Sequence, residues 1–220
     1  MSSRRIVAVF TLCLFAALLS GQTGSTETWR FDSLDRIGGH AVTVLGHPKV
    51  IAAPGSKAVD FNGFDDALFF DLHPLAGAEA WTWEVLFRPA HGGAPEQRFF
   101  HLQENGTDNR MLFEIRVIGE QWCLDSFAKS GENSQALLDR TKLHPLGEWF
   151  HVAAVYDGHQ FRNSVNGVQE GSAELHLDPQ KAGQTSVGVR FNKVNYFKGA
   201  VSVARMTPRA LNPEEFLKKP

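Results

Sequence analysis

Cysteine is scarce in this 220-residue chain, which contains only Cys13 and Cys123. Cys13 lies in an apolar N-terminal run that resembles an export signal, so one cysteine remains once that run is removed. An internal disulfide is then excluded, and a chain of about 200 residues has to rely on its hydrophobic core. Cys123 follows Trp122 in a strand-like run, which predicts a packed, unreactive thiol.

Clustered positive charge is also missing, since no basic run is longer than Lys218-Lys219. Loss of Arg4 and Arg5 from the 22 basic residues, against 24 acidic ones, leaves a net charge of about −4. The sequence therefore lacks the basic surface of a nucleic-acid-binding protein and the polybasic patch that binds anionic lipids.

Long apolar runs are absent as well. The longest, Ile6–Leu19, is shorter than the roughly 20 residues that span a bilayer. Arg4 and Arg5 precede it and Ser20–Ser25 follows it, which is the pattern of a secretory signal peptide. We expect residues 1–22 to be removed and residues 23–220 to form one domain without a membrane span. The mature chain is then secreted, to the periplasm or the extracellular space.

Short strands joined by tight turns account for most of the remaining chain. Residues 147–171 contain two strand-like runs, each followed by a turn dipeptide, Asp157-Gly158 and Asn166-Gly167. Residues 81–88 alternate cleanly, with three aromatic residues and Val85 on one side. About a dozen such runs predict an all-β, two-sheet antiparallel sandwich. Asn212 and Pro213 predict a short C-terminal helical turn.

Seven segments in order resemble the laminin-G-like, concanavalin A-like lectin/glucanase jelly roll. They are Val59–Asp66, Trp83–Pro89, Gly147–Ala153, Val155–Gly158, Val165–Gly167, Phe197–Ala200 and Thr207–Phe216. The resemblance implies two antiparallel sheets, one of them concave, with sugar or protein ligands and often a bound calcium ion. Ser164 stands where this family usually has an aromatic residue before Val-Asn-Gly, which would make a groove there wider and more polar.

Candidate ligand-binding residues are those that the strand alternation directs away from the core. If their strands are neighbours, they line the concave sheet: Glu84, Arg88, His101, Glu114, Arg116, Arg162, Ser164 and Arg190. Arginine side chains suit the carboxylates or sulfates of glycans. The alternative is that Glu114 and Arg116 form charge pairs on a solvated face.

A calcium site is a second candidate, because calcium prefers several oxygen ligands. Asn62, Asp65 and Asp66 share one turn, and the resemblance implies calcium at such a loop in some members. Ordinary turn formation by Asn and Asp is the alternative.

The remaining tryptophans and one histidine are expected to be mainly structural. Trp81, Trp83 and Trp149 are expected in the core, whereas Trp122 lies either in the core or against a sugar ring. His151 is expected to be structural, with a backbone or tyrosine partner.

The sequence favours a secreted, non-catalytic module that binds an extracellular glycan. It has no Glu-x-Asp-x-x-Glu stretch, which would place paired glucanase carboxylates on one strand, and no His-Glu-x-x-His zinc motif. A polysaccharide lyase or glycoside hydrolase of the same fold is one alternative, with His101, Gln103 and Arg116 as its candidate groups. A module that binds another extracellular protein is the other.

Overall fold

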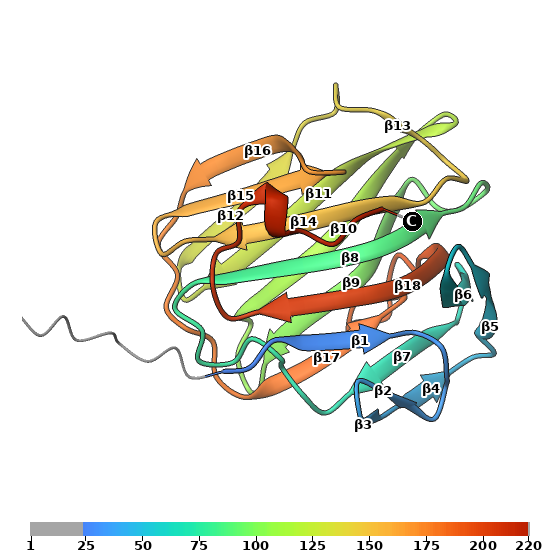
Figure 1. Cartoon of the computed structure of the whole chain (residues 1–220), viewed down its shortest axis with the longest axis horizontal. Helices are drawn as coiled ribbons and strands as arrows, with labels where there is room; N and C mark the ends of the chain where they lie inside the picture. The colour runs from blue at the N-terminus through green and yellow to red at the C-terminus, as the bar shows by residue number, and fades with distance from the viewer. Residues whose placement is uncertain (1–23, 220) are drawn as a thin grey trace, which may run out of the picture.

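A computed structural model describes residues 24–219, and these residues form two large antiparallel sheets packed face to face (Figure 1). The expected signal peptide lies outside the described residues. Within them, no helix is long and apolar enough to cross a membrane.

Sheet I holds eight strands, seven of them in a continuous row with β1 beside β18. In spatial order they are β16 (Val168–Glu174), β15 (Gln160–Val165), β14 (Phe150–Tyr156), β8 (Trp81–Pro89), β18 (Lys198–Thr207), β6 (Ser56–Asn62) and β5 (Lys49–Ala53), with β1 (Glu27–Arg30).

Sheet II also holds eight strands and lies behind sheet I in Figure 1. In spatial order they are β12 (Asn133–Leu138), β11 (Gln121–Ser130), β10 (Arg110–Ile118), β9 (Glu96–Glu104), β17 (Gly183–Val187), β7 (Ala67–Phe70) and β4 (Thr43–Leu45), with β13 (His144–Pro145) beside β11. A small separate ribbon pairs β2 (Arg36–Ile37) with β3 (His40–Ala41), and the helical turn η1 spans Pro213–Glu215.

The predicted meander is confirmed as β14, β15 and β16. Both central residues of the second turn, Asn166 and Gly167, are left-handed, with φ of 50° and 81°. That geometry matches the twist of the two strands that they join. At the first turn, the Asp157 carboxylate accepts the backbone N–H groups of His159 and Gln160, at 3.0 and 2.8 Å. The all-β sandwich and its short C-terminal helical turn are therefore as predicted.

Aromatic side chains fill the space between the sheets. Phe99 stacks on Phe87 and on Phe113, with ring centroids 4.4 and 5.5 Å apart and the rings nearly parallel. Trp122 meets Phe87 edge-on at 5.1 Å and is fully buried. Such pairs contribute stability beyond the area that they bury. Trp122 therefore belongs to the core, and Cys123 is buried as expected.

Two predictions for single side chains are wrong. Trp149 lies just before β14 rather than in it. Its side chain is half-buried instead of in the core, with the Arg88 guanidinium 5.5 Å from its ring centroid. His151 is fully buried, but its Nε2 is bonded to the Glu84 carboxylate at 3.0 Å, not to a backbone or tyrosine group.

Candidate functional site

The eight candidate ligand residues do not share one surface. Glu84, Arg88, Arg162 and Ser164 lie on the outer face of sheet I. His101, Glu114 and Arg116 lie on the outer face of sheet II, and Arg190 follows β17 in the next loop. Alternation along a strand tells inward from outward, but it does not tell which sheet the strand joins. The expectation of one common groove is therefore wrong.

The C-terminal strap, residues 208–219, crosses the outer face of sheet I over β8 and β14 (Figure 1). Leu211 and Phe216 pack on Ala153 and Val155 of β14 and form a small apolar cluster separate from the main core. Thr82 of β8 holds the start of the strap, because its hydroxyl donates to the Arg209 carbonyl and accepts the Leu211 N–H, both at 2.8 Å.

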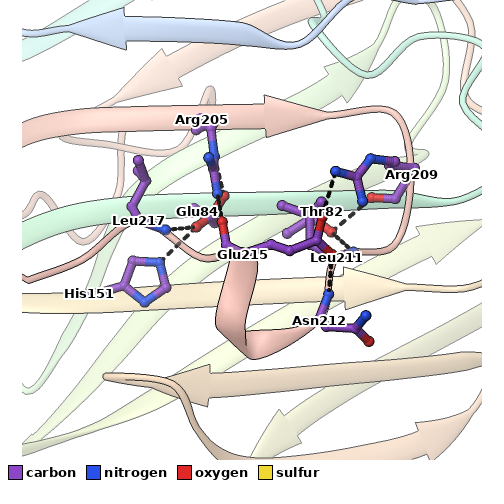
Figure 2. Close-up of polar contacts among 9 residues, drawn as sticks. All are labelled: Thr82, Glu84, His151, Arg205, Arg209, Leu211, Asn212, Glu215 and Leu217. Carbon is purple, nitrogen blue, oxygen red and sulfur yellow. Dashed lines mark hydrogen bonds and ion pairs between the residues drawn. The ribbon is translucent and has the colours of Figure 1, made fainter.

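Glu84 fixes the end of the strap (Figure 2). Its fully buried carboxylate accepts hydrogen bonds from Arg205 Nε at 2.6 Å, His151 Nε2 at 3.0 Å and Leu217 N–H at 2.7 Å. Burial opposes its ionisation, but these three donors outweigh burial and hold the pKa of Glu84 below its ordinary value. Glu84 is thus a structural anchor beneath the strap and is closed to ligands.

A cavity of about 280 Å³ remains between the strap and the β15–β16 hairpin. Arg162 and Ser164 line it, together with Leu211, Asn212 and Phe216. Arg162 is already engaged, since its Nη1 lies 2.8 Å from Asp157 and 2.9 Å from Gln160. Ser164 contributes a small hydroxyl side chain to the lining, and the volume of the cavity lies just below the roughly 300–1,000 Å³ of common ligand pockets.

Another hollow, of about 830 Å³, lies at one end of sheet I. Its lining residues include Asp157 and Glu174 and two exposed histidines, His159 and His176. The exposure of both histidines makes this an open rim rather than an enclosed site.

The outer face of sheet II carries a network of ion pairs across three adjacent strands. Arg98 of β9 and Arg116 of β10 each bind one oxygen of Glu114, both at 2.9 Å. Arg116 also reaches Asp125 of β11 at 2.6 Å, and Glu96 lies 3.4 Å from Arg98. The side chains of Arg98, Glu114, Arg116 and Asp125 are at most 13% exposed. Glu114 and Arg116 therefore form charge pairs, as the alternative prediction held, but these pairs are buried and not on a solvated face.

Asp125 is incompletely hydrogen-bonded, as are Arg98 and Arg116, whose Nη1 atoms are buried without a hydrogen-bond partner among residues 24–219. Burial raises the pKa of Asp125 to about 6, with Arg116 opposing the rise and the nearby Glu114 carboxylate adding to it. Its Oδ1 is buried without a hydrogen-bond partner within the described chain.

Further along the same face, hydrogen-bond donors lack acceptors. His101 is fully buried, and its Nδ1 accepts the Phe191 N–H at 3.3 Å, so the proton of the neutral ring resides on Nε2. That Nε2 and the Nε of Arg110 are buried without partners among residues 24–219. Burial, together with Arg190 and Arg110, lowers the pKa of His101 to about 3, so the ring stays neutral.

Aromatic surface adjoins these donors. The Arg110 guanidinium lies 4.8 Å from the centroid of the half-exposed Phe127 ring, and Phe191 packs on His101 at 4.8 Å. Sequence reasoning missed Arg98, Arg110 and Asp125. Arg110 and Asp125 fall on the outward alternation of their strands, whereas Arg98 has the parity of the inward-facing Phe100 and faces outward only because the β9–β10 pairing shifts register between Phe113 and Glu114. The sequence does not show which strands are adjacent, and these residues form one surface only because β9, β10 and β11 are neighbours in sheet II.

The expected calcium ligands form a hydrogen-bonded turn. Asn62 Oδ1 accepts the N–H of Phe64 at 2.8 Å, and Asn62 Nδ2 donates to Asp65 at 2.7 Å. Asp66 is buried and accepts the N–H groups of His47 and Asn62 at 2.7 and 3.0 Å. Within residues 24–219, no group of three or more His, Cys, Asp or Glu side chains is placed to hold a metal ion. Calcium binding at this turn stays a prediction, for which a calcium-dependent rise in Tm is the test.

The two packed antiparallel sheets form a jelly-roll β-sandwich. The chain belongs to the concanavalin A-like lectin/glucanase superfamily, whose Laminin_G_3 family model matches residues 61–216. A search of curated protein sequences found no match.

Solved structures share this fold at low sequence identity. Domain 4 of AbnA, an extracellular arabinanase from Geobacillus stearothermophilus, solved with arabinotriose, is 18% identical with a TM-score of 0.64, over 87% of this chain and 96% of that one. The binding domain of botulinum neurotoxin DC in complex with SialylT is 12% identical with a TM-score of 0.59, over 88% of this chain and 50% of that one. A SAP-like pentraxin from Limulus polyphemus is 18% identical with a TM-score of 0.55, over 79% of each chain.

Proposed function

We propose that this protein is a secreted, non-catalytic module that binds an extracellular glycan on the outer face of sheet II. The observation that carries this proposal is the combination of partner-less hydrogen-bond donors and half-exposed aromatic surface on that face, around His101, Arg110 and Phe127. Sugar hydroxyl and ring oxygens accept hydrogen bonds, and sugar rings pack on aromatic side chains. AbnA domain 4, which shares this fold, was solved with arabinotriose, and the toxin binding domain was solved with SialylT, which supports the same class of ligand.

Sheet I is the weaker candidate for the same role. The strap covers Thr82, Glu84, Ala153 and Val155. Both carboxylate oxygens of Glu84 already accept hydrogen bonds from other residues of the chain and are not available to a ligand. Within residues 24–219, the side chains of Arg110 and Phe127 on sheet II stay partly exposed, and the buried ion pairs beside them give the face a rigid floor. A preorganised surface binds with less loss of conformational entropy than a mobile one.

Glycoside hydrolysis is the second candidate, favoured by one observation. Glu114 and Asp125 are directly opposite each other on β10 and β11, and the pKa of Asp125 is raised to about 6, as a general acid requires. Both oxygens of Glu114 are nevertheless held by arginines, which leaves it poorly placed to act as a base or nucleophile. Release of reducing ends from a polysaccharide panel, lost in Asp125→Asn, would establish the enzyme instead of the binding module.

The binding proposal is tested with a panel of neutral and acidic oligosaccharides, measured by isothermal titration calorimetry. Phe127→Ala removes the aromatic surface of sheet II, and Arg162→Ala is the matched control in the cavity of sheet I. We expect Phe127→Ala to weaken binding by about twofold to tenfold, which corresponds to one lost aromatic contact, and Arg162→Ala to have no effect. The opposite pattern, or no binding by any glycan, would contradict the proposal.

A further inference from the structure

We propose that the glycan held on sheet II is acidic, and that its carboxylate or sulfate group binds between His101, Arg110 and Arg190. This inference rests on the proposed function and adds the chemical class of the ligand.

Backbone geometry places the three side chains close together. His101 of β9 is directly opposite Leu112 of β10, and Arg110 lies two residues from Leu112, on the same side of the sheet. Such diagonal neighbours are about 7–8 Å apart, within reach of a long side chain. Arg190 directly precedes Phe191, whose N–H is bonded to the His101 ring.

Donors at this place outnumber the available acceptors. Among residues 24–219, His101 Nε2 and Arg110 Nε are buried without a hydrogen-bond partner. The Arg190 carbonyl accepts the Lys193 N–H at 2.8 Å, but the Arg190 side chain has no hydrogen bond or ion pair within these residues. The nearby Glu114 carboxylate is already shared by two other arginines. Asp108 accepts a bond from Lys129 at 2.7 Å and lies 3.6 Å from Arg110, at the exposed edge of the face. A bound anion would supply the missing acceptors.

Electrostatics point the same way. Burial lowers the pKa of Arg190, and the like charges of Arg110 and Arg98 lower it further, while the Glu114 carboxylate opposes the fall without reversing it. The arginines therefore repel one another in the free protein. An anion between them removes that repulsion. The planar guanidinium group can also bind a carboxylate or sulfate through two parallel hydrogen bonds, which a neutral sugar cannot match.

The test measures binding of the full chain to three size-matched oligosaccharides: an oligogalacturonate, a dextran sulfate and a neutral dextran. Arg190→Gln removes the charge in question. Lys193→Gln is the matched control, because it makes the same charge change at an exposed position in the same loop. We expect at least one acidic ligand to bind more tightly than dextran, and Arg190→Gln to weaken that binding by about tenfold or more. Lys193→Gln should change it by less than about twofold.

The two acidic arms separate a uronate carboxylate from a sulfate ester as the preferred anion. Equal binding of neutral and acidic ligands on sheet II, unchanged by Arg190→Gln, would overturn this inference and leave the proposed function standing. If no saccharide binds, both fail. Arg190 is half-exposed and lies in a loop, and far-UV circular dichroism checks that the Arg190→Gln variant keeps its fold. Arg110→Gln is a second variant, and it should lose the same amount of affinity for the acidic ligand.

Discussion

Replacement of Glu84 by alanine should be one of the most damaging single substitutions on sheet I. The carboxylate is fully buried and satisfies three donors, from Arg205, His151 and Leu217. Removing one partner of a buried charge pair costs about 3–5 kcal/mol, because the other charge is left uncompensated. Arg205 is partly exposed and can turn toward water, so we place the loss at about 4 kcal/mol.

Urea denaturation followed by tryptophan fluorescence measures this loss, since Trp83 and Trp122 are buried. A loss of about 4 kcal/mol is a large part of the 5–15 kcal/mol that stabilises a typical domain, and it corresponds to a fall in Tm of about 8–16 °C. Asp60→Ala is the control, because its ion pair with Arg88 is 3.8 Å long and about one-third exposed on both sides. The control should change stability by about 1 kcal/mol or less. A Glu84→Ala loss no larger than the control would refute the anchoring role of Glu84.

Two further predictions concern sheet II and one of its loops. Burial raises the pKa of Asp125 to about 6, so between about pH 4 and 6 the folded state holds a proton that the unfolded chain has released near pH 3.8. The free energy of unfolding should therefore fall by about 3 kcal/mol as the pH rises through this range. Asp125→Asn should remove that part of the pH dependence, as measured by urea titrations at both ends of the range. If the pH profiles of the two proteins coincide, Asp125 is ionised throughout. Gly188 has φ of +89°, and an added Cβ would lie 2.5 Å from the Phe61 ring, whereas Gly55 has φ of +65° with open space around it. Gly188→Ala should therefore cost about 1–3 kcal/mol more than Gly55→Ala, and equal losses would show that the Phe61 contact relaxes freely.

The sequence predicted the strands and turns well because these depend on local signals. The period-two pattern of residues 81–88 and the Asn166-Gly167 turn both act over a few residues, and both are found in the structure. The aromatic core followed from the same alternation, with Trp149 as the exception because it lies one residue outside its strand.

The candidate site was less predictable because it depends on long-range pairing. Glu84 and Glu114 both point outward from their strands, yet one lies under the strap on sheet I and the other in the ion-pair network of sheet II. No local signal connects Leu217 with Glu84, which are far apart in sequence, or β9 with β10 and β11 as one surface. The partner-less His101 Nε2 likewise emerges only when every neighbouring acceptor is known.

The central claim is that sheet II, and not sheet I, binds the ligand. Two-dimensional NMR of the labelled protein during titration with an acidic oligosaccharide tests it most directly. We predict that the shifted amide signals cluster on β9, β10 and β11 and on the loop that carries Arg190 and Phe191. Shifts confined to β14, β15 and the C-terminal strap, or no shifts with any saccharide, would contradict the account.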